Sequence, residues 1–163
     1  NEKFIIRRLT VSTMQERVSI IVSPISIVVL LLLAAYFFIM IGELTYIIIV
    51  IILGLMVIGL TIVLIYSIKL LKQKNQNNSN SAPAITYMGD EILSICNFDG
   101  VTKSIKISDI KHITIETDGG LIRQAYDNIG FVVQGTCGEE KVVVKYVAYP
   151  SQAIAKLDKL IGN

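Results

Sequence analysis

Two apolar runs separated by only three residues constrain this chain more than any other feature. They cover Val18–Met40 and Leu44–Ile68, and neither contains an Asp, Glu, Lys, Arg or His residue. About 20 apolar residues in an α-helix span the ~30 Å hydrocarbon core of a bilayer. Both runs exceed that length, and the Ile41-Gly42-Glu43 connection leaves room only for a helical hairpin. We therefore expect two transmembrane helices, at about 18–40 and 44–68, in preference to a buried soluble core.

A cleaved signal peptide is the alternative for the first run, and the sequence does not favour it. The run is longer than the roughly 7–15 apolar residues of a signal peptide, and a long lead of 17 residues stands before it. No small-x-small cleavage motif precedes a hydrophilic segment. The first run is therefore expected to remain in the protein as a membrane helix.

The charges beside the hairpin predict its orientation. Six basic residues flank the two runs: Arg7, Arg8, Arg17, Lys69, Lys72 and Lys74. The connection between the runs carries only Glu43. Because the cytoplasmic flanks of membrane helices are enriched in Lys and Arg, both termini are expected in the cytoplasm. The chain is thus predicted to be an integral protein of the cell's inner or plasma membrane, with Cys96 and Cys137 reduced.

A polar segment divides the hairpin from a β-rich region. Residues 73–83 show no apolar periodicity, and we expect a flexible linker that reaches about 35 Å when extended. From Ala84 onwards the apolar period changes to two, which is typical of strands. The predicted organisation is an N-terminal strand or arm (1–12), a two-helix hairpin (13–72), the linker (73–83) and a soluble domain (84–163).

Three shorter patterns predict local structure at and within the hairpin. Lys3–Val11 is rich in β-branched and apolar residues, which predicts a short strand or a surface helix that can dock on the soluble domain. Thr13 and Glu16 stand at capping-box spacing, which predicts that the first helix begins there. Gly54 and Gly59 are expected to allow close packing against the first helix, or else to mark a seam between copies.

Seven short strands and one helix are predicted after the linker. The strands are expected at Ala84–Met88, Glu91–Asn97, Val101–Ile107, Lys111–Thr117, Leu121–Ala125, Ile129–Gln134 and Glu140–Val147. Turn signals such as Asp99-Gly100 separate them. After Pro150, apolar residues recur at helical spacing, which predicts a helix packed on the sheet, with a partner-helix surface as the alternative. These residues are Ala153, Ile154, Leu157, Leu160 and Ile161.

This order of elements resembles the pleckstrin-homology-like fold, in which a bent seven-stranded sheet forms a partial barrel capped by a C-terminal helix. The segment Ser104–Ile115 is similar to the corner between the third and fourth strands of bacterial members. The whole chain resembles small bacterial two-helix membrane proteins with a cytosolic domain of this kind. The expected fold is therefore a membrane α-helical hairpin plus a mainly-β α+β domain, and the resemblance implies a binding or scaffolding module.

The resemblance does not bring a phosphoinositide site with it. Pleckstrin-homology domains that bind phosphoinositides hold the phosphates with a Lys/Arg cluster around their first hairpin. The corresponding place here is Gly89-Asp90-Glu91, whose carboxylates would repel a phosphate group. We therefore do not expect this chain to bind phosphoinositides.

The residues that catalysis or metal binding requires are sparse in this sequence. His112 is the only histidine, and it falls on the polar side of a predicted strand. Together with Cys96 and Cys137 it provides too few ligands for a zinc site. Gly119-Gly120 matches neither glycine-rich phosphate-binding fingerprint. We therefore predict that the chain is not an enzyme and has no catalytic residue, cofactor site or metal site.

The distribution of charge argues against nucleic acid as a partner. The net charge is +2, but residues 1–82 carry seven basic and three acidic residues, whereas residues 83–163 carry eight and ten. The excess of positive charge therefore belongs to the hairpin flanks, and a nucleic-acid-binding domain needs it on the folded domain. The expected partners are the lipid bilayer and a protein, either another chain or a second copy.

Two functions of different classes are compatible with these patterns. The first is a membrane-anchored binding or scaffolding module, an accessory subunit or interaction protein at the inner face of a bacterial membrane. The second resembles the two-helix β-barrel effectors of anti-phage signalling, in which a ligand triggers oligomerisation and membrane disruption. That effector would need a cationic pocket. The basic residues available for it are Lys103, Lys106, Lys111, Arg123 and Lys145.

Overall fold

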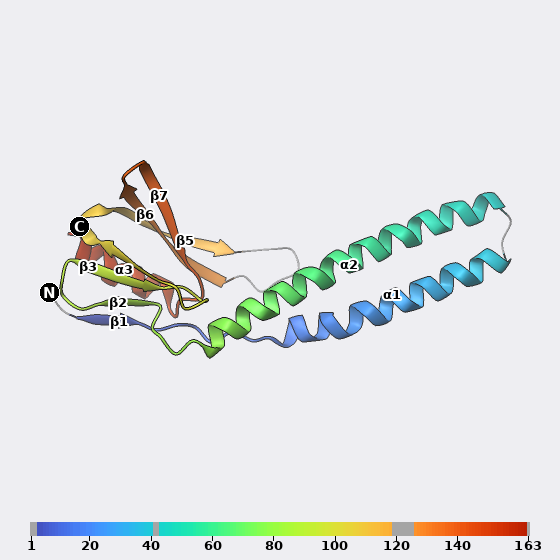
Figure 1. Ribbon diagram of the computed structural model, residues 1–163, viewed down its shortest axis with the longest axis horizontal. Helices are drawn as coiled ribbons and strands as arrows, with labels where there is room; N and C mark the ends of the chain where they lie inside the picture. Colours follow the sequence, from blue (N-terminus) through green and yellow to red (C-terminus); the bar gives the residue numbers. More distant parts are fainter. Residues whose placement is uncertain (1–2, 41–42, 119–125, 163) are drawn as a thin grey trace. The chain divides into compact units, whose positions relative to one another are not determined.

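The chain folds into two compact units, which are described here separately. The computed structural model describes residues 3–40, 43–118 and 126–162 (Figure 1). One unit, the hairpin unit, comprises Ser12–Asn75. The other, the β unit, comprises Asn1–Val11 together with Gln76–Asn163. The β unit is therefore assembled from chain segments on both sides of the hairpin.

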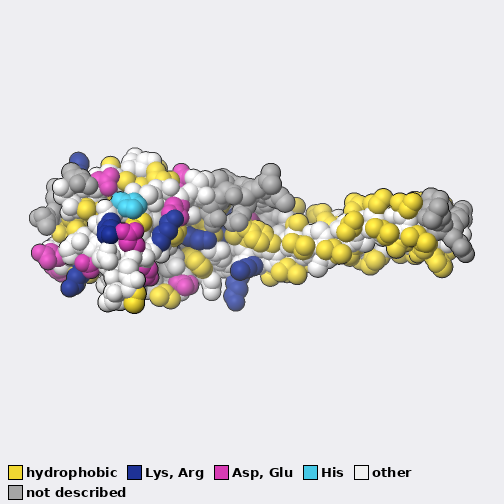
Figure 2. All heavy atoms as spheres, turned by 90° about the horizontal axis from the view of Figure 1, so that it is seen from above, with side chains coloured by type: hydrophobic (Ala, Val, Ile, Leu, Met, Phe, Trp, Pro, Cys, Tyr) yellow, Lys and Arg dark blue, Asp and Glu magenta, His cyan; other side chains and the backbone are white. Residues whose placement is uncertain are grey.

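The hairpin unit consists of two long apolar helices. Helix α1 spans Met14–Met40 and helix α2 spans Glu43–Ser79, whose last residues belong to the β unit. Both helices are long and apolar enough to cross a membrane. Most of their large apolar side chains are exposed, and Figure 2 shows such side chains over much of the visible face of the helices. Exposed apolar surface on this scale suits contact with lipid and is costly in water.

The two helices lie side by side (Figure 1), and each carries one stripe of less exposed residues. The less exposed positions recur at alternating spacings of three and four residues, the heptad spacing of coiled coils. In α1 they include Glu16, Ile20, Ser23, Ile27, Leu30, Ala34 and Phe37. In α2 they include Tyr46, Val50, Leu53, Val57, Leu60, Leu64, Ser67, Leu71 and Lys74. A shared heptad spacing keeps the facing stripes in register over the whole described length of the hairpin.

Two of the predictions made for the hairpin are wrong in detail. Helix α1 does begin after Thr13, whose carbonyl accepts a hydrogen bond from the N–H of Arg17. Glu16 does not complete a capping box, because its carboxylate is buried and bonds to Lys74 instead. A Cβ atom on Gly54 or Gly59 would meet nothing within 4 Å, so these glycines do not serve close packing against α1.

The predicted flexible linker is also wrong over most of its length. Residues 73–79 continue α2 as regular helix up to Ser79. Asparagine is a poor helix former in isolation, but Asn77 and Asn78 bond through their side-chain amides to the backbone of Leu9 and Val11. These contacts within the β unit fix the end of the helix, so tertiary bonding outweighs the local preference of a polar, Asn-rich segment.

Seven strands form two antiparallel sheets in the described part of the β unit. The first sheet has the order β1 (Phe4–Ile6), β2 (Ile85–Tyr87), β3 (Ile92–Cys96) and β4 (Thr102–Lys106). A short 3₁₀ turn, η1 (Ile107–Asp109), leads into the second sheet. That sheet has the order β5 (Ile110–Asp118), β6 (Tyr126–Gly135) and β7 (Gly138–Val144). Helix α3 (Pro150–Ile161) follows, which completes an α+β layout.

The first strand comes from the N-terminal arm. Phe4, Ile5 and Ile6 pair with Tyr87, Thr86 and Ile85, so of the two structures considered for Lys3–Val11 this part adopts the strand and joins the first sheet. Six of the predicted later strands are also present, with β6 beginning three residues before the predicted Ile129. The predicted strand Leu121–Ala125 lies outside the described residues.

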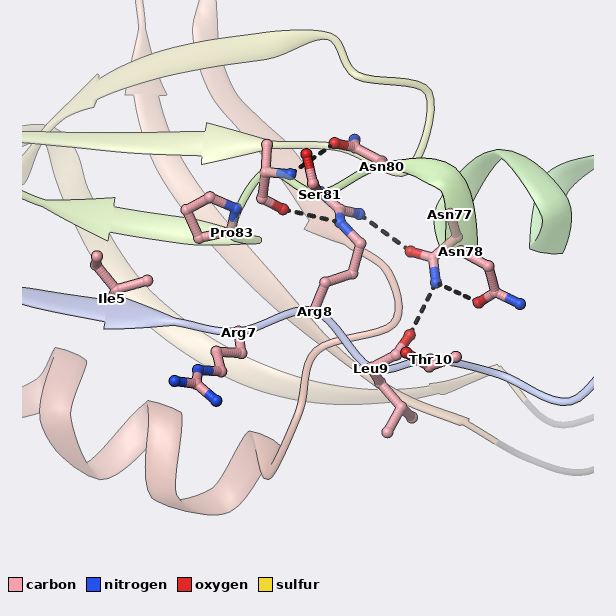
Figure 3. Close-up of a pocket in the computed structure, with 11 residues that line it drawn as sticks. Ile5, Arg7, Arg8, Leu9, Thr10, Asn77, Asn78, Asn80, Ser81 and Pro83 are labelled. Atoms are coloured by element: carbon pink, nitrogen blue, oxygen red, sulfur yellow. Dashed lines mark hydrogen bonds between the residues drawn. The ribbon is translucent and has the colours of Figure 1, made fainter.

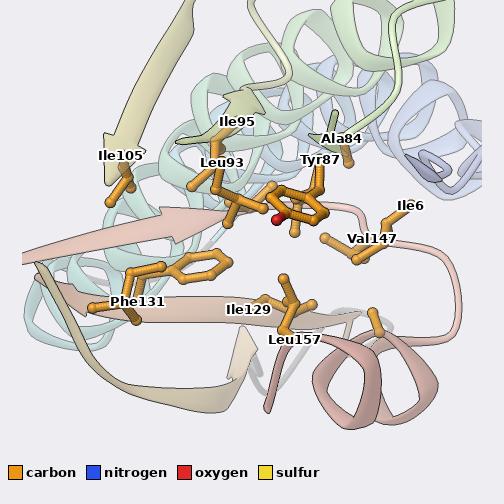
Figure 4. Close-up of a cluster of buried hydrophobic side chains, with 14 of the residues drawn as sticks. Ile6, Ala84, Tyr87, Leu93, Ile95, Ile105, Ile129, Phe131, Val147 and Leu157 are labelled. Atoms are coloured by element: carbon orange, nitrogen blue, oxygen red, sulfur yellow. The ribbon is translucent and has the colours of Figure 1, made fainter. Parts of the chain in front are cut away.

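The core of the β unit lies between the inner faces of the sheets and α3. Its largest fully buried side chains include Tyr87, Leu93, Ile129, Phe131 and Leu157 (Figure 4). The apolar stripe of α3 packs on this core, as predicted, through buried Ala153 and Leu157. The two sheets are not closed by continuous pairing. Among the described residues one isolated bridge, between Arg8 and Val147, joins the arm to the segment after β7.

Candidate interaction surface around the N-terminal arm

Arg8 fixes the arm against the rest of the β unit. Its guanidinium group donates hydrogen bonds to the carbonyl oxygens of Cys96 (2.6 Å), Asn97 (3.0 Å) and Ala82 (3.3 Å), and to Oδ1 of Asn77 (3.1 Å). A guanidinium group has five N–H donors, and these four acceptors occupy most of them. Arg8 is therefore a positioning residue, and little of its hydrogen-bonding capacity is left for a ligand (Figure 3).

Two asparagine side chains hold the same arm from the end of α2. Asn77 is almost fully buried and donates to the carbonyl oxygen of Leu9 at 2.8 Å. The side-chain amide of Asn78 bonds to Val11 in both directions: it accepts from the backbone N–H (3.0 Å) and donates to the carbonyl oxygen (2.8 Å). This two-way bond imitates the pairing of a neighbouring strand. The segments by which the chain leaves and re-enters the β unit are thereby tied to each other.

A hollow of about 340 Å³ with a mixed polar and apolar lining lies between the arm and the segment after α2 (Figure 3). Its lining comes from Ile5 and Arg7–Thr10 on one side and from residues between Asn77 and Pro83 on the other. The described residues of this lining include two arginines and no Asp or Glu residue. Four of the five N–H donors of Arg8 are engaged, so little of its hydrogen-bonding capacity is left for a ligand in this hollow.

A second hollow, of about 200 Å³, lies on the other side of the arm, between β1 and the start of α3. It shares Ile5 and Arg7 with the first hollow and adds Tyr149, Gln152 and Lys156, again without an acidic residue. In Figure 3 the side chains of Arg7 and Arg8 leave the arm in different directions, with Arg7 pointing towards α3. The two hollows together form one surface that we call the arm surface.

Three lysines of strands β4, β5 and β7 are neutralised by carboxylates. Lys103 pairs with Glu140 and Lys111 with Glu139, each at 2.6 Å, and Lys141 pairs with Glu116. The hydrogen bond and the charge of Lys111 lower the pKa of Glu139 below its ordinary value. By contrast, Arg7 and Lys156 make no ion pair with any residue that the structure describes. Among the described residues, the arm surface therefore carries two basic side chains that no carboxylate neutralises.

The glycine in the middle of β6 makes room for one of these ion pairs. A Cβ atom on Gly130 would lie 2.6 Å from Oε1 of Glu116 and 3.0 Å from Oγ1 of Thr114. Both side chains come from the neighbouring strand β5. The carboxylate of Glu116 thus crosses the bare backbone of β6 to reach Lys141 on β7. This arrangement links strands β5 and β7 across β6, and the carboxylate of Glu116 is occupied by its ion pair with Lys141.

The residues singled out for chemistry do not converge. His112 and Cys137 are exposed, whereas Cys96 is buried. No three His, Cys, Asp or Glu residues in the described ranges come together in a way that could hold a metal ion. Of the basic residues considered for a cationic pocket, Lys103 and Lys111 are paired as above, and Lys145 lines a small hollow beside Glu116. Arg123 and Gly119-Gly120 lie outside the described residues.

The residues that build the arm surface were missed by sequence reasoning. Arg7 and Arg8 were interpreted only as membrane-flanking charges, and Asn77 and Asn78 as part of a linker. One signal was available: Asn77 follows Leu71 and Lys74 of the less exposed stripe of α2 at a spacing that keeps it on the same side of the helix. That spacing indicates a helix that continues past the apolar run.

Comparison of the chain with known protein families, with curated proteins and with solved structures finds no match.

Proposed function

We propose that the protein is a membrane-anchored binding module. The two apolar helices hold it in the bilayer, and the β unit binds a partner protein at the arm surface. The observation that carries this proposal is that surface itself, which combines exposed apolar and basic side chains with a lining free of carboxylates. Exposed groups of this kind are typical of places where a protein meets a partner.

The proposed fold of the β unit is pleckstrin-homology-like. The support is the order of elements: a four-stranded sheet, a three-stranded sheet and then a C-terminal helix. In this interpretation the hairpin is an insertion between the first and second strands. Because folds of this kind serve many functions, the fold supports a binding role only as an analogy.

The proposed orientation puts the β unit in the cytoplasm of a bacterial cell. It rests on the six basic residues beside the two helices and on the positive-inside rule. In the cytoplasm, exposed Cys137 would remain a free thiol, and the arm surface would meet soluble or membrane-associated proteins.

Site-specific photo-crosslinking in cells tests the binding role. A benzoylphenylalanine residue replaces Tyr149, which is 76% exposed on the arm surface, and a matched control replaces Val101, which is 64% exposed in the turn between β3 and β4. We expect a discrete protein adduct from position 149 and none from position 101. Only uncrosslinked chain from both positions would contradict the proposal. A ladder of self-adducts combined with liposome leakage would favour the membrane-disrupting effector.

A further inference from the structure

The free edge of β1 is the feature of the arm surface that identifies the kind of partner. Strand β1 ends the order of the first sheet, so one of its edges has no neighbouring strand among the described residues. An edge of this kind can pair with an extended segment of another chain, as in β-strand addition. Beside this edge lies the hollow of about 200 Å³ between β1 and α3.

Backbone bonding along the arm indicates which groups point into that hollow. The carbonyl oxygen of Ile6 accepts from the N–H of Ala84, on the side of β2. The carbonyl oxygen of Arg7 accepts from the N–H of Ala148, on the opposite side. Because successive residues of a strand direct their backbone groups to alternate edges, the N–H and C=O of Ile5 face the same side as those of Arg7.

The start of α3 leaves this part of the edge open. Tyr149 adopts a left-handed conformation (φ 51°) and turns the chain away from the arm, and Pro150 begins the helix. The last backbone hydrogen bond on this side of the arm therefore joins Ala148 to Arg7. Ile5, two residues earlier in the arm, is not reached by this pairing. No hydrogen bond joins the backbone of Ile5 to α3 or its approach within the described residues.

The side chains around the open edge specify the chemistry of an occupant. Ile5 is 57% exposed and, with Tyr149, offers apolar contact. Exposed Arg7 and Lys156 offer positive charge, and none of the described residues that line the hollow is an Asp or a Glu. Charge complementarity therefore favours an acidic segment, since like charges across an interface are strongly disfavoured.

We propose that an extended, acidic peptide segment of a partner protein binds between β1 and α3. Its backbone pairs with Ile5, and its carboxylates bond to Arg7 and Lys156. This proposal rests on the binding role proposed above and names the partner's chemistry. An anionic lipid surface is the other candidate for two basic residues, but polybasic lipid sites use about four to eight Lys or Arg residues. The alternating backbone N–H and C=O groups of an open strand edge also match an extended peptide backbone better than they match a lipid headgroup.

A selection with the full chain tests this proposal. The protein in nanodiscs of zwitterionic lipid is panned with a phage library of random heptapeptides, and empty nanodiscs remove background binders. We expect the enriched peptides to alternate acidic with apolar or β-branched residues. No enrichment over empty nanodiscs, or enrichment of basic peptides, would overturn the proposal.

Synthetic versions of the enriched peptides then separate strand pairing from simple charge attraction. The variant Arg7→Gln/Lys156→Gln should bind them about tenfold more weakly, because two charge-assisted bonds are lost. The matched control Lys106→Gln/Lys159→Gln removes the same charge from exposed positions outside the groove and should change the affinity less than twofold. A proline placed at alternate peptide positions should abolish binding in one register and not in the other, since it removes a backbone donor.

The outcomes also distinguish this proposal from the broader one. If peptides bind both double variants equally, or if binding appears only when the nanodiscs contain anionic lipid, the acidic-segment proposal is wrong. A protein adduct from photo-crosslinking at position 149 would still support the binding role in that case. If that adduct is also absent, both proposals fall.

Discussion

The buried ion pair between Glu16 and Lys74 gives the most quantitative prediction for the hairpin. Each side chain is 3% exposed, and Nζ of Lys74 lies 2.6 Å from Oε1 of Glu16. Nζ also donates to the carbonyl oxygen of Ser12 at 3.0 Å, whereas Oε2 of Glu16 is buried without a hydrogen-bond partner. The pair therefore joins the base of α1 to α2, but it leaves part of the carboxylate's desolvation cost uncompensated.

Removing one member should cost far more than removing both. In Glu16→Ala or Lys74→Ala the remaining charge stays buried without its partner, which costs about 3–5 kcal/mol. In Glu16→Leu/Lys74→Leu no charge remains, and apolar side chains of similar length fill the space, so stability should stay within about 1 kcal/mol of the parent chain. The predicted coupling energy between the two positions is therefore large and favourable.

Hydrogen exchange measured by mass spectrometry in nanodiscs reports this difference locally. An opening cost reduced by about 3 kcal/mol should speed exchange of amides in the first turns of α1 more than 100-fold in either single variant. The double variant should exchange at close to the parent rate. If each single variant changes exchange less than fivefold and the effects simply add, the pair is not the buried, coupled contact described here.

Three further predictions concern the β unit. Arg8→Ala leaves four carbonyl-type acceptors without their donor and should lower the free energy of unfolding by about 2–4 kcal/mol, measured by thermal unfolding. Gly130→Ala should cost about 1–2 kcal/mol in the same assay, because the added Cβ displaces the Glu116 carboxylate from its ion pair with Lys141 and also presses on Oγ1 of Thr114. In an NMR titration, the pKa of Glu139 should lie below that of an ordinary glutamate and rise in Lys111→Gln. Since the folded pKa is the lower one, the contribution of this pair is present above the ordinary Glu pKa and is lost as pH falls through the lowered value.

Local patterns predicted the elements whose formation depends on local sequence. The two apolar runs, the amphipathic helix after Pro150 and the strands next to strong turns all follow from periodicity and turn chemistry. Each of these signals lies within a dozen or so consecutive residues. The hairpin helices could be located in the same way, and their apolar surface needed no knowledge of the rest of the chain.

The arm surface could not be predicted, because it depends on contacts between distant parts of the chain. Asn78 bonds to Val11 across 67 residues, and Arg8 bonds to Cys96 across 88. The sequence of residues 73–83 taken alone indicates a polar linker. The sequence of the arm taken alone indicates a pair of arginines that flank a membrane helix. Only the folded chain joins the end of α2 to the arm, which makes the first hollow, and brings the arm beside α3, which makes the second.

Labelling of Cys137 tests the central claim, an anchored hairpin with a cytosolic β unit, most directly. Cys137 is exposed and Cys96 is buried, so a membrane-impermeant maleimide should react at one position, and Cys137→Ser supplies the control without it. We predict that Cys137 is not labelled in intact cells, is labelled after permeabilisation, and stays with the membrane fraction after alkaline carbonate washing. Labelling in intact cells, or release of the protein by carbonate, would contradict the account.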